Sequence, residues 1–158
     1  MEAKKFAIVR IRGKNKIFRK IEDTMKMLRL YDKNNCIIVD CSDSMLGMIY
    51  KIKDYITWGE ASEETIRILL EKRGKIFGGK PLTEDYLKSK TKLNYIQFAK
   101  EIFEAKKSLK DIPGLKTYFR LKPPTGGFER KGIKLPYSMG GTVGYRREKI
   151  NDLIKKMI

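Results

Sequence analysis

The chain has 158 residues, of which 36 are Lys or Arg, 19 are Asp or Glu and none is His, which gives a formal net charge of +17. The lack of histidine and the presence of only two cysteines exclude most zinc sites and every histidine-based general base. So large a positive excess, with a pI near 9.9, indicates a polyanionic partner such as nucleic acid rather than a merely basic soluble surface.

The first sixty residues alternate between strand and helix patterns. The predicted elements are a strand over 5–12, a helix over 18–31, a strand over 36–41, a helix from Ser42 to Ile52 and a strand over 55–58 that ends at Gly59. In the predicted strands, side chains of one face recur at every second residue, and in the predicted helices the apolar side chains recur at helical spacing. This order predicts a β-α-β-α-β unit, an α+β fold whose helices cover one face of the sheet.

The first strand has apolar side chains on both faces, and the face of Phe6 and Ile8 must be buried by something other than water. Phe6 and Ile8 share this face with Arg10 and Arg12, because alternate residues of a strand point the same way. Large apolar side chains in water mark an interaction surface. We therefore expect either the C-terminal part of the chain or a partner to cover Phe6 and Ile8.

Residues 61–158 have a mostly helical pattern that is interrupted once. The predicted helical segments are 62–74, a short turn over 83–87, 94–109 and 146–157. Between about 115 and 145 the periodicity is lost, and glycine and proline recur. The sequence thus predicts a compact unit over 1–60 and a helical extension over 61–158 that carries a Gly/Pro-rich loop.

The Gly/Pro-rich loop and its flanks are the first candidate for RNA contact. Glycine lets a backbone approach phosphates closely, and cationic side chains neutralise them. The candidate residues are Lys122, Gly126, Gly127, Arg130, Lys131, Lys134, Tyr137, Arg146 and Arg147. Phe128, Tyr137 and Tyr145 are candidates for stacking on unpaired bases. The alternative is a surface loop that binds nothing; we favour RNA contact because of the flanking charge.

A second basic patch follows the first strand. Its candidate residues are Arg10, Arg12, Lys14, Lys16 and Arg19. The competing interpretation is a solvated strand edge and helix start, where any polar residue would serve. We favour phosphate contact at this patch because its cations are close together in the sequence.

One catalytic alternative deserves a test against the structure. Asp40, Asp43 and Asp54, joined by Glu22 or Asp23, could meet at strand ends and bind Mg²⁺, as in a metal-dependent nuclease. The other interpretation makes the first three a strand end, a helix cap and a surface residue. No Walker motif and no G-x-G-x-x-G motif after a strand is present, so we expect no nucleotide cofactor.

Four segments together resemble a known family. They are 6–13 (FAIVRIRG), 21–30 (IEDTMKMLRL), 53–60 (KDYITWGE) and 140–157 (GGTVGYRREKINDLIKKM). The chain resembles, essentially end to end, the large-subunit ribosomal protein family called L-thirty, in its long archaeal form, whose eukaryotic counterpart is L-seven. The resemblance implies a ferredoxin-like unit over the first sixty residues, followed by an extension.

The same resemblance implies a structural, non-catalytic protein of the large ribosomal subunit that binds 23S rRNA. Neighbouring ribosomal proteins are possible partners, while no cofactor, metal, membrane, small-molecule substrate or homo-oligomer is expected. The sequence has no apolar run long enough to span a bilayer and no signal-peptide pattern, so a cytoplasmic location is expected. The alternatives are a free-standing RNA- or DNA-binding regulator and the nuclease described above.

Overall fold

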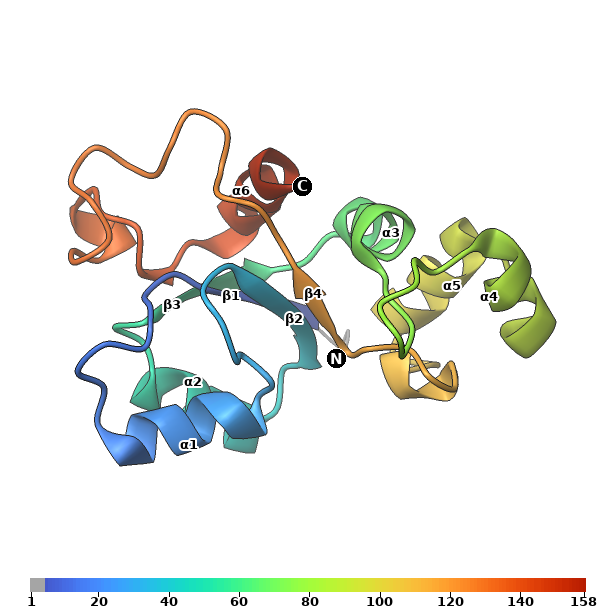
Figure 1. Cartoon of the computed structure of the whole chain (residues 1–158). Helices are drawn as coiled ribbons and strands as arrows, with labels where there is room; N and C mark the ends of the chain where they lie inside the picture. The colour runs from blue at the N-terminus through green and yellow to red at the C-terminus, as the bar shows by residue number, and fades with distance from the viewer. Residues whose placement is uncertain (1–4) are drawn as a thin grey trace.

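A computed structural model describes residues 5–158 as an α+β fold, as the sequence predicts (Figure 1). The strands are β1 (Lys5–Arg10), β2 (Asn35–Asp40), β3 (Ile56–Glu60), β4 (Tyr118–Arg120) and β5 (Gly144–Tyr145). The helices are α1 (Arg19–Met27), α2 (Asp43–Lys51), α3 (Glu63–Arg73), α4 (Glu84–Thr91), α5 (Tyr95–Phe103) and α6 (Ile150–Met157). Three short 3-10 helices are η1 (Leu109–Asp111), η2 (Tyr137–Met139) and η3 (Arg147–Lys149).

All five strands form one sheet in the order β4-β2-β1-β3-β5. The central strand β1 runs antiparallel to both β2 and β3, so that Ala7 lies between Ile38 and Gly59. The edge strands are β4, antiparallel to β2, and β5, parallel to β3. Both edges come from the second part of the chain, so residues 5–60 and 61–158 share a single sheet.

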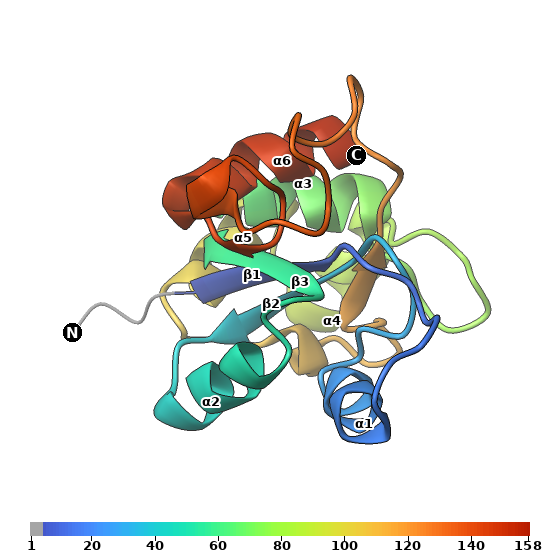
Figure 2. The same cartoon turned by 90° about the vertical axis from the view of Figure 1, so that its left-hand side faces the viewer.

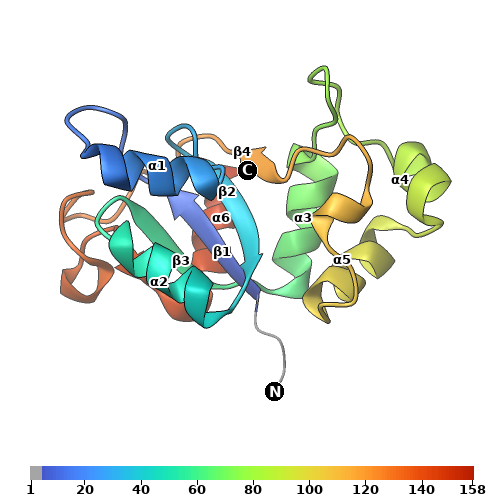
Figure 3. The ribbon, with the colours of Figure 1, turned by 90° about the horizontal axis from the view of Figure 1, so that it is seen from below.

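Helices α1 and α2 cover the face of the sheet that carries Phe6 and Ile8 (Figure 3). These two side chains are buried with Met25 of α1 and with Ile49, which is fully buried in α2. The expectation that the C-terminal region or a partner covers this face is therefore wrong for most of the face, although Tyr118 and Tyr145 of that region pack at its edges. The two helices on this face bury their apolar stripes on the sheet.

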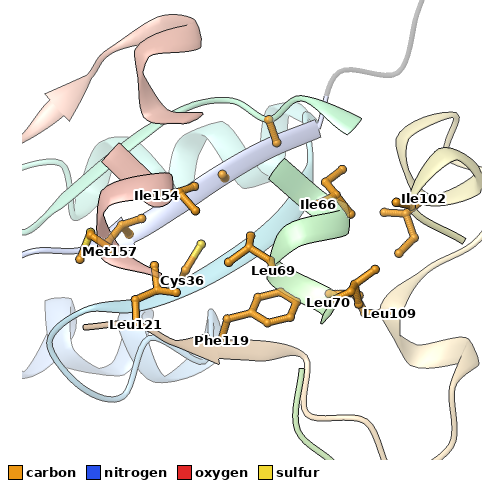
Figure 4. Close-up of a cluster of buried hydrophobic side chains, with 14 of the residues drawn as sticks. Cys36, Ile66, Leu69, Leu70, Ile102, Leu109, Phe119, Leu121, Ile154 and Met157 are labelled. Carbon is orange, nitrogen blue, oxygen red and sulfur yellow. The ribbon is translucent and has the colours of Figure 1, made fainter. Parts of the chain in front are cut away.

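The opposite face of the sheet packs against the C-terminal region (Figure 4). Cys36 of β2 and Phe119 of β4 meet Leu69 of α3 and Ile154 of α6 in this cluster. Helix α5 packs on α3, away from the sheet, and α4 lies beside it (Figure 1). Both cysteines are free, Cys36 in the core and Cys41 at the surface. No helix of residues 5–158 has the length and apolar character needed to cross a membrane.

Helix α5 is shorter than the predicted helix over 94–109, because the chain turns at Ala105. Ala105 has a positive φ of 58°, and its N–H donates to the carbonyl of Ile102 at 3.0 Å. The N–H of Lys106 donates to the carbonyl of Glu101 at 2.9 Å. This pair of bonds is a Schellman motif, which ends a helix, and Leu109 is buried from a separate 3-10 turn.

Gly59 lies inside β3 and does not end it, in contrast to the prediction. The chain at η3 passes so close that a Cβ at this position would lie 1.9 Å from the carbonyl oxygen of Arg147. The Arg146 N–H donates to the carbonyl of Trp58 at 2.9 Å at the same crossing. Glycine is thus required here for close approach of two backbones rather than for a turn.

Candidate nucleic-acid interface

Basic loops gather at the end of the sheet where β1 finishes. Because β1 is antiparallel to β2 and β3, the loop over 11–18 that follows it lies beside the loops that lead into β2 and β3. The N–H groups of Ile11 and Arg12 both donate to the carbonyl of Tyr55, at 2.9 and 3.2 Å. The antiparallel topology therefore places three surface loops at one end.

Arg10 is the structural centre of this end. It is only 1% exposed, and its guanidinium donates to the carbonyls of Leu30 at 2.7 Å and Tyr31 at 3.0 Å. Further bonds reach the carbonyls of Arg12 at 2.9 Å and Gly13 at 3.2 Å. Burial lowers the pKa of Arg10, against the opposing effect of nearby carboxylates. Its donors are occupied by the protein, so Arg10 holds the loop rather than reaching outward.

The other candidate cations of this end lie nearer the surface. Arg12 is half-buried, with its guanidinium 5.0 Å from the ring centre of Tyr55, while Lys14, Lys16 and Arg19 are exposed. Lys14 pairs with Asp32 at 2.8 Å, and its hydrogen bond lowers the pKa of that carboxyl. Lys16 and Arg19 have the weakest contacts of the group. Arg19 is 95% exposed, and its Nε lies as far as 4.0 Å from the carboxylate of Asp23.

The Gly/Pro-rich loop returns to the protein at several points. The N–H groups of Lys122 and Thr125 donate to the carbonyls at the end of α6, at 2.8 and 2.9 Å. Gly126 and Gly127 are exposed and have φ values of 83° and 79°, which L-residues rarely adopt. A Cβ at Gly141 would lie 2.0 Å from the carbonyl oxygen of Leu135, where the loop doubles back on itself.

A second buried arginine fixes the base of this loop. Arg146 is 4% exposed and donates to the carboxylate of Glu129 at 2.7 Å, to the carbonyl of Thr142 at 2.6 Å and to the hydroxyl of Thr57 at 2.8 Å. Its guanidinium also lies 4.6 Å from the ring centre of Tyr137. Burial alone would raise the pKa of Glu129, but hydrogen bonding, above all from Arg146, lowers it overall. Arg146 and Tyr137 therefore stabilise the loop from within.

The loop presents its remaining candidate cations to solvent. The exposed residues are Lys122, Arg130, Lys131, Lys134 and Arg147. Within residues 5–158 none of the five forms an ion pair. The alkyl chain of Lys131 packs beside Gly140, where an added Cβ would lie 3.2 Å from its Cδ. Sequence reasoning did not separate these cations from the two buried arginines; for Arg10 the signal was its position on the buried face of Phe6 and Ile8.

Acidic side chains concentrate at the opposite end of the sheet. Asp40 ends β2 and pairs with Lys5, and Glu60 ends β3 beside it across β1. Glu63 and Glu64 follow in the first turn of α3, and Glu64 pairs with Lys155 at 2.9 Å. Asp40 and Glu64 are thus both paired with lysines, and the basic loops at the other end are better suited to phosphates.

The carboxylates considered for a metal site do not come together. Within residues 5–158, no three side chains among Cys, Asp and Glu are arranged to hold a metal ion. Asp43 is the first residue of α2, whose N-cap is Ser42; the Ser42 hydroxyl accepts a hydrogen bond from the N–H of Met45 at 3.2 Å. Asp54 contributes its backbone carbonyl to Arg12. The arrangement of these residues gives no support to a nuclease.

Comparison with known proteins decides the family. The family model described as ribosomal protein L30p/L7e matches residues 6–56. The large ribosomal subunit protein uL30 of Methanopyrus kandleri is 49% identical over 149 residues, which cover 94% of this chain and 100% of that protein. The chain belongs to the L30p/L7e family of ribosomal proteins.

Two further relatives extend this similarity over almost the whole chain. Large ribosomal subunit protein uL30 of Nanoarchaeum equitans is 48% identical and covers 97% of this chain, with 98% of that protein covered. The uL30 protein of Archaeoglobus fulgidus is 45% identical, with 96% of this chain and 99% of that protein covered. The extension over 61–158 is therefore shared with archaeal members of the L30p/L7e family and confirms the predicted long form.

Proposed function

We propose that this chain is a structural, non-catalytic constituent of the large ribosomal subunit and binds its rRNA through two groups of cations, all exposed except the half-buried Arg12. The strand-end cations are Arg12, Lys14, Lys16 and Arg19, and the loop cations are Lys122, Arg130, Lys131, Lys134 and Arg147. Membership of the L30p/L7e family supports the ribosomal role. The RNA-facing surface is our proposal from charge and exposure.

One observation carries the assignment of the surface. Five loop cations are exposed and unpaired within residues 5–158, on a backbone that Arg146 and several main-chain hydrogen bonds hold in shape. Cations without protein partners are free to replace the counterions of phosphates, and each replacement favours binding. Arg10 and Arg146 contribute by fixing the loops, as do Gly126, Gly127 and Tyr137.

Sedimentation of the tagged chain from cell lysate tests the ribosomal role. We expect the wild-type chain to migrate with large subunits in a high-Mg²⁺ gradient and to stay with them through a moderate salt wash. A chain that is found only at the top of the gradient contradicts the proposal.

A triple variant tests the surface itself. Arg130→Gln, Lys131→Gln and Lys134→Gln together should release much of the chain during the salt wash, because three phosphate contacts are lost. The matched control changes three exposed lysines of the helical region, Lys90→Gln, Lys100→Gln and Lys110→Gln, with the same loss of charge. Equal retention of both variants would show that the loop cations do not contact rRNA.

A further inference from the structure

Two exposed phenylalanines occur in the same sequence context at separate places in the chain. The tripeptide Lys-Ile-Phe appears at residues 16–18 and again at 75–77. Phe18 is 77% exposed and Phe77 is 73% exposed, more than any other large hydrophobic residue of the described part. In both copies the isoleucine points inward: Ile17 packs against the cluster under α1 and α2, and Ile76 against the cluster under α3.

The exposure of Phe18 has no explanation in the stability of α1. Phe18 is the N-cap residue of this helix and makes no side-chain cap. Its carbonyl accepts the N–H groups of Ile21 at 2.9 Å and Glu22 at 3.1 Å, which any residue could do. Serine, threonine, asparagine or aspartate would stabilise the helix better at this position. A phenylalanine here is a cost to the isolated protein.

Phe77 lies at the tip of a short hairpin that is tightly fixed. The N–H of Phe77 donates to the carbonyl of Gly114 at 2.9 Å, and the Lys116 N–H donates to the carbonyl of Lys75 at 2.8 Å. Gly78 and Gly79 follow with φ values of 87° and 79°, which close the turn. The ring is therefore held out from the surface by an ordered backbone, not by a loose end.

Both tips carry positive charge and project from the same side of the molecule. Lys16 and Lys20 flank Phe18, and Lys75 and Lys80 flank Phe77; all four are exposed, and within residues 5–158 none of them forms an ion pair. The loop between β1 and α1 and the hairpin between α3 and α4 lie on the right in Figure 2 and at the top in Figure 3. An apolar ring between unpaired cations suits RNA, which offers base faces beside phosphates.

The aromatic residues that the sequence suggested for stacking are engaged elsewhere. Phe128 packs against the core, and Tyr137 lies against the guanidinium of Arg146. Tyr145 donates to Glu60 and sits 6.1 Å from the ring of Trp58; burial and that carboxylate raise the pKa of Tyr145 to about 12. Tyr145 is still 43% exposed, but the rings of Phe18 and Phe77 are more exposed and have no aromatic or cationic partner within residues 5–158.

We propose that Phe18 and Phe77 each stack on an unpaired base of the rRNA, while the flanking lysines neutralise the adjacent phosphates. This inference rests on the proposed function, because it specifies how the same partner is contacted. Phe18 adds a non-ionic contact beside the strand-end cations, and Phe77 extends the proposed RNA-binding surface to the hairpin between α3 and α4. The alternative occupant, an apolar pocket of a neighbouring protein, is distinguished by the test below.

The test measures binding of the full chain to deproteinised large-subunit rRNA. Phe18→Ala and Phe77→Ala should each weaken binding about 5- to 150-fold, the range for loss of one base–aromatic stack. Because no charge is removed, the slope of log K against log salt should stay as in the wild type. Ile96→Ala, at a residue that is 59% exposed on α5, is the control and should bind normally.

Replacement by leucine and by tryptophan separates stacking from apolar contact. Phe18→Leu and Phe77→Leu should bind as weakly as the alanine variants, since leucine has no π-face. The Phe77→Trp variant should bind rRNA with wild-type affinity, and its tryptophan fluorescence should fall on binding. The Ile96→Trp variant should bind equally well without this fall in fluorescence.

Two results would overturn the inference. Wild-type affinity of both alanine variants, in a protein that does bind rRNA, would refute stacking and leave the proposed function intact. Alanine variants that bind rRNA normally but fail to join the subunit would assign the two rings to a protein pocket. If the wild-type chain itself does not bind rRNA, the proposed function fails first.

Discussion

The two regions of the molecule each fix a basic loop with a buried arginine, but with different chemistry. In the first region Arg10 donates hydrogen bonds only to main-chain carbonyls. Two of these, of Leu30 and Tyr31, are far from Arg10 in the sequence. In the second region Arg146 binds the carboxylate of Glu129 as well as neutral oxygens. The first arginine is accommodated by dipoles and the second by a counter-charge.

This difference shows two ways to bury a cation at the base of an RNA-binding loop. Carbonyl dipoles satisfy the donors of Arg10, and no carboxylate binds it directly, although Asp32 and Glu22 act on its charge from nearby. More of its positive potential therefore remains to add to that of the strand-end cations. Glu129 cancels the charge of Arg146, so that only the exposed side chains of the Gly/Pro-rich loop act on a phosphate. The loops should therefore respond differently to mutation and to pH.

Separation of the two regions should have the largest effect. A chain of residues 1–60 would expose one whole face of the sheet, including Val9, Ile11 and Cys36, which are all fully buried here. Exposure of the two aliphatic side chains alone removes about 3–6 kcal/mol of stabilisation. We expect the fragment to lack a cooperative thermal transition by circular dichroism. A sharp transition near that of the full chain would show that the first region folds independently.

Loss of Arg146 should come next. Arg146→Met leaves the half-buried carboxylate of Glu129 without its partner and should lower the free energy of unfolding by about 3 kcal/mol at neutral pH. Urea denaturation measures this change. Arg146→Met combined with Glu129→Gln should recover part of the loss, whereas no recovery would mean that the two side chains are not coupled.

The same variant predicts a pH dependence with a definite sign. Hydrogen bonding lowers the pKa of Glu129 in the folded wild-type chain. This pair therefore contributes stability above the unfolded pKa of the carboxyl, and the contribution is lost as the pH falls through the folded pKa. In Arg146→Met the contribution is absent, so the gap in stability to the wild type should narrow as the pH falls below the unfolded carboxyl pKa of about 4.3. A constant gap would contradict the role of the ion pair.

Loss of Arg10 should cost somewhat less and show a weaker pH dependence, because the carboxylates of Asp32 and Glu22 act on its charge without accepting its hydrogen bonds. Arg10→Met leaves several buried carbonyls without donors, and we expect a loss of about 2–3 kcal/mol by urea denaturation. No carboxylate accepts a hydrogen bond from its guanidinium. A gap to the wild type that narrows in acid as much as it does for Arg146 would erase the distinction between the two sites.

A pair of glycines gives the smallest effects, with opposite signs. Gly59→Ala places a methyl group against the carbonyl of Arg147 and should destabilise the chain by about 2 kcal/mol. Gly47 lies in α2, where an added Cβ meets nothing within 4 Å, so Gly47→Ala should stabilise by about 0.5–1 kcal/mol. Thermal unfolding of both variants checks the signs, and a tolerated Gly59→Ala would refute close contact between β3 and η3.

The order of elements in the first region was predictable because periodicity and caps act locally. Alternation defined β1, and the Ser42 cap and the apolar spacing defined α2. The cover of Phe6 and Ile8 was not predictable from the same pattern, because both faces of β1 are apolar and either could meet α1 and α2. Which helix covers which face is a long-range outcome.

The second region shows where local signals end. Strands β4 and β5 are three and two residues long, too short for alternation to appear, and form because the edges of the central sheet offer free hydrogen-bonding groups. Ala105 ends α5 with a positive φ, a conformation that the sequence does not predict for alanine. Among the site residues, basic type alone could not distinguish buried Arg146 from exposed Arg147; that distinction depends on the tertiary positions of Glu129 and Thr57.

The salt dependence of rRNA binding tests the central claim most directly. For the wild-type chain on deproteinised large-subunit rRNA, log K should fall steeply and linearly with log salt. The triple loop variant at Arg130, Lys131 and Lys134 should reduce that slope by about 2–3, at roughly 0.7–0.9 per lost phosphate contact, while the control variant at Lys90, Lys100 and Lys110 should leave the slope near the wild-type value. Equal slopes for all three proteins would contradict the account.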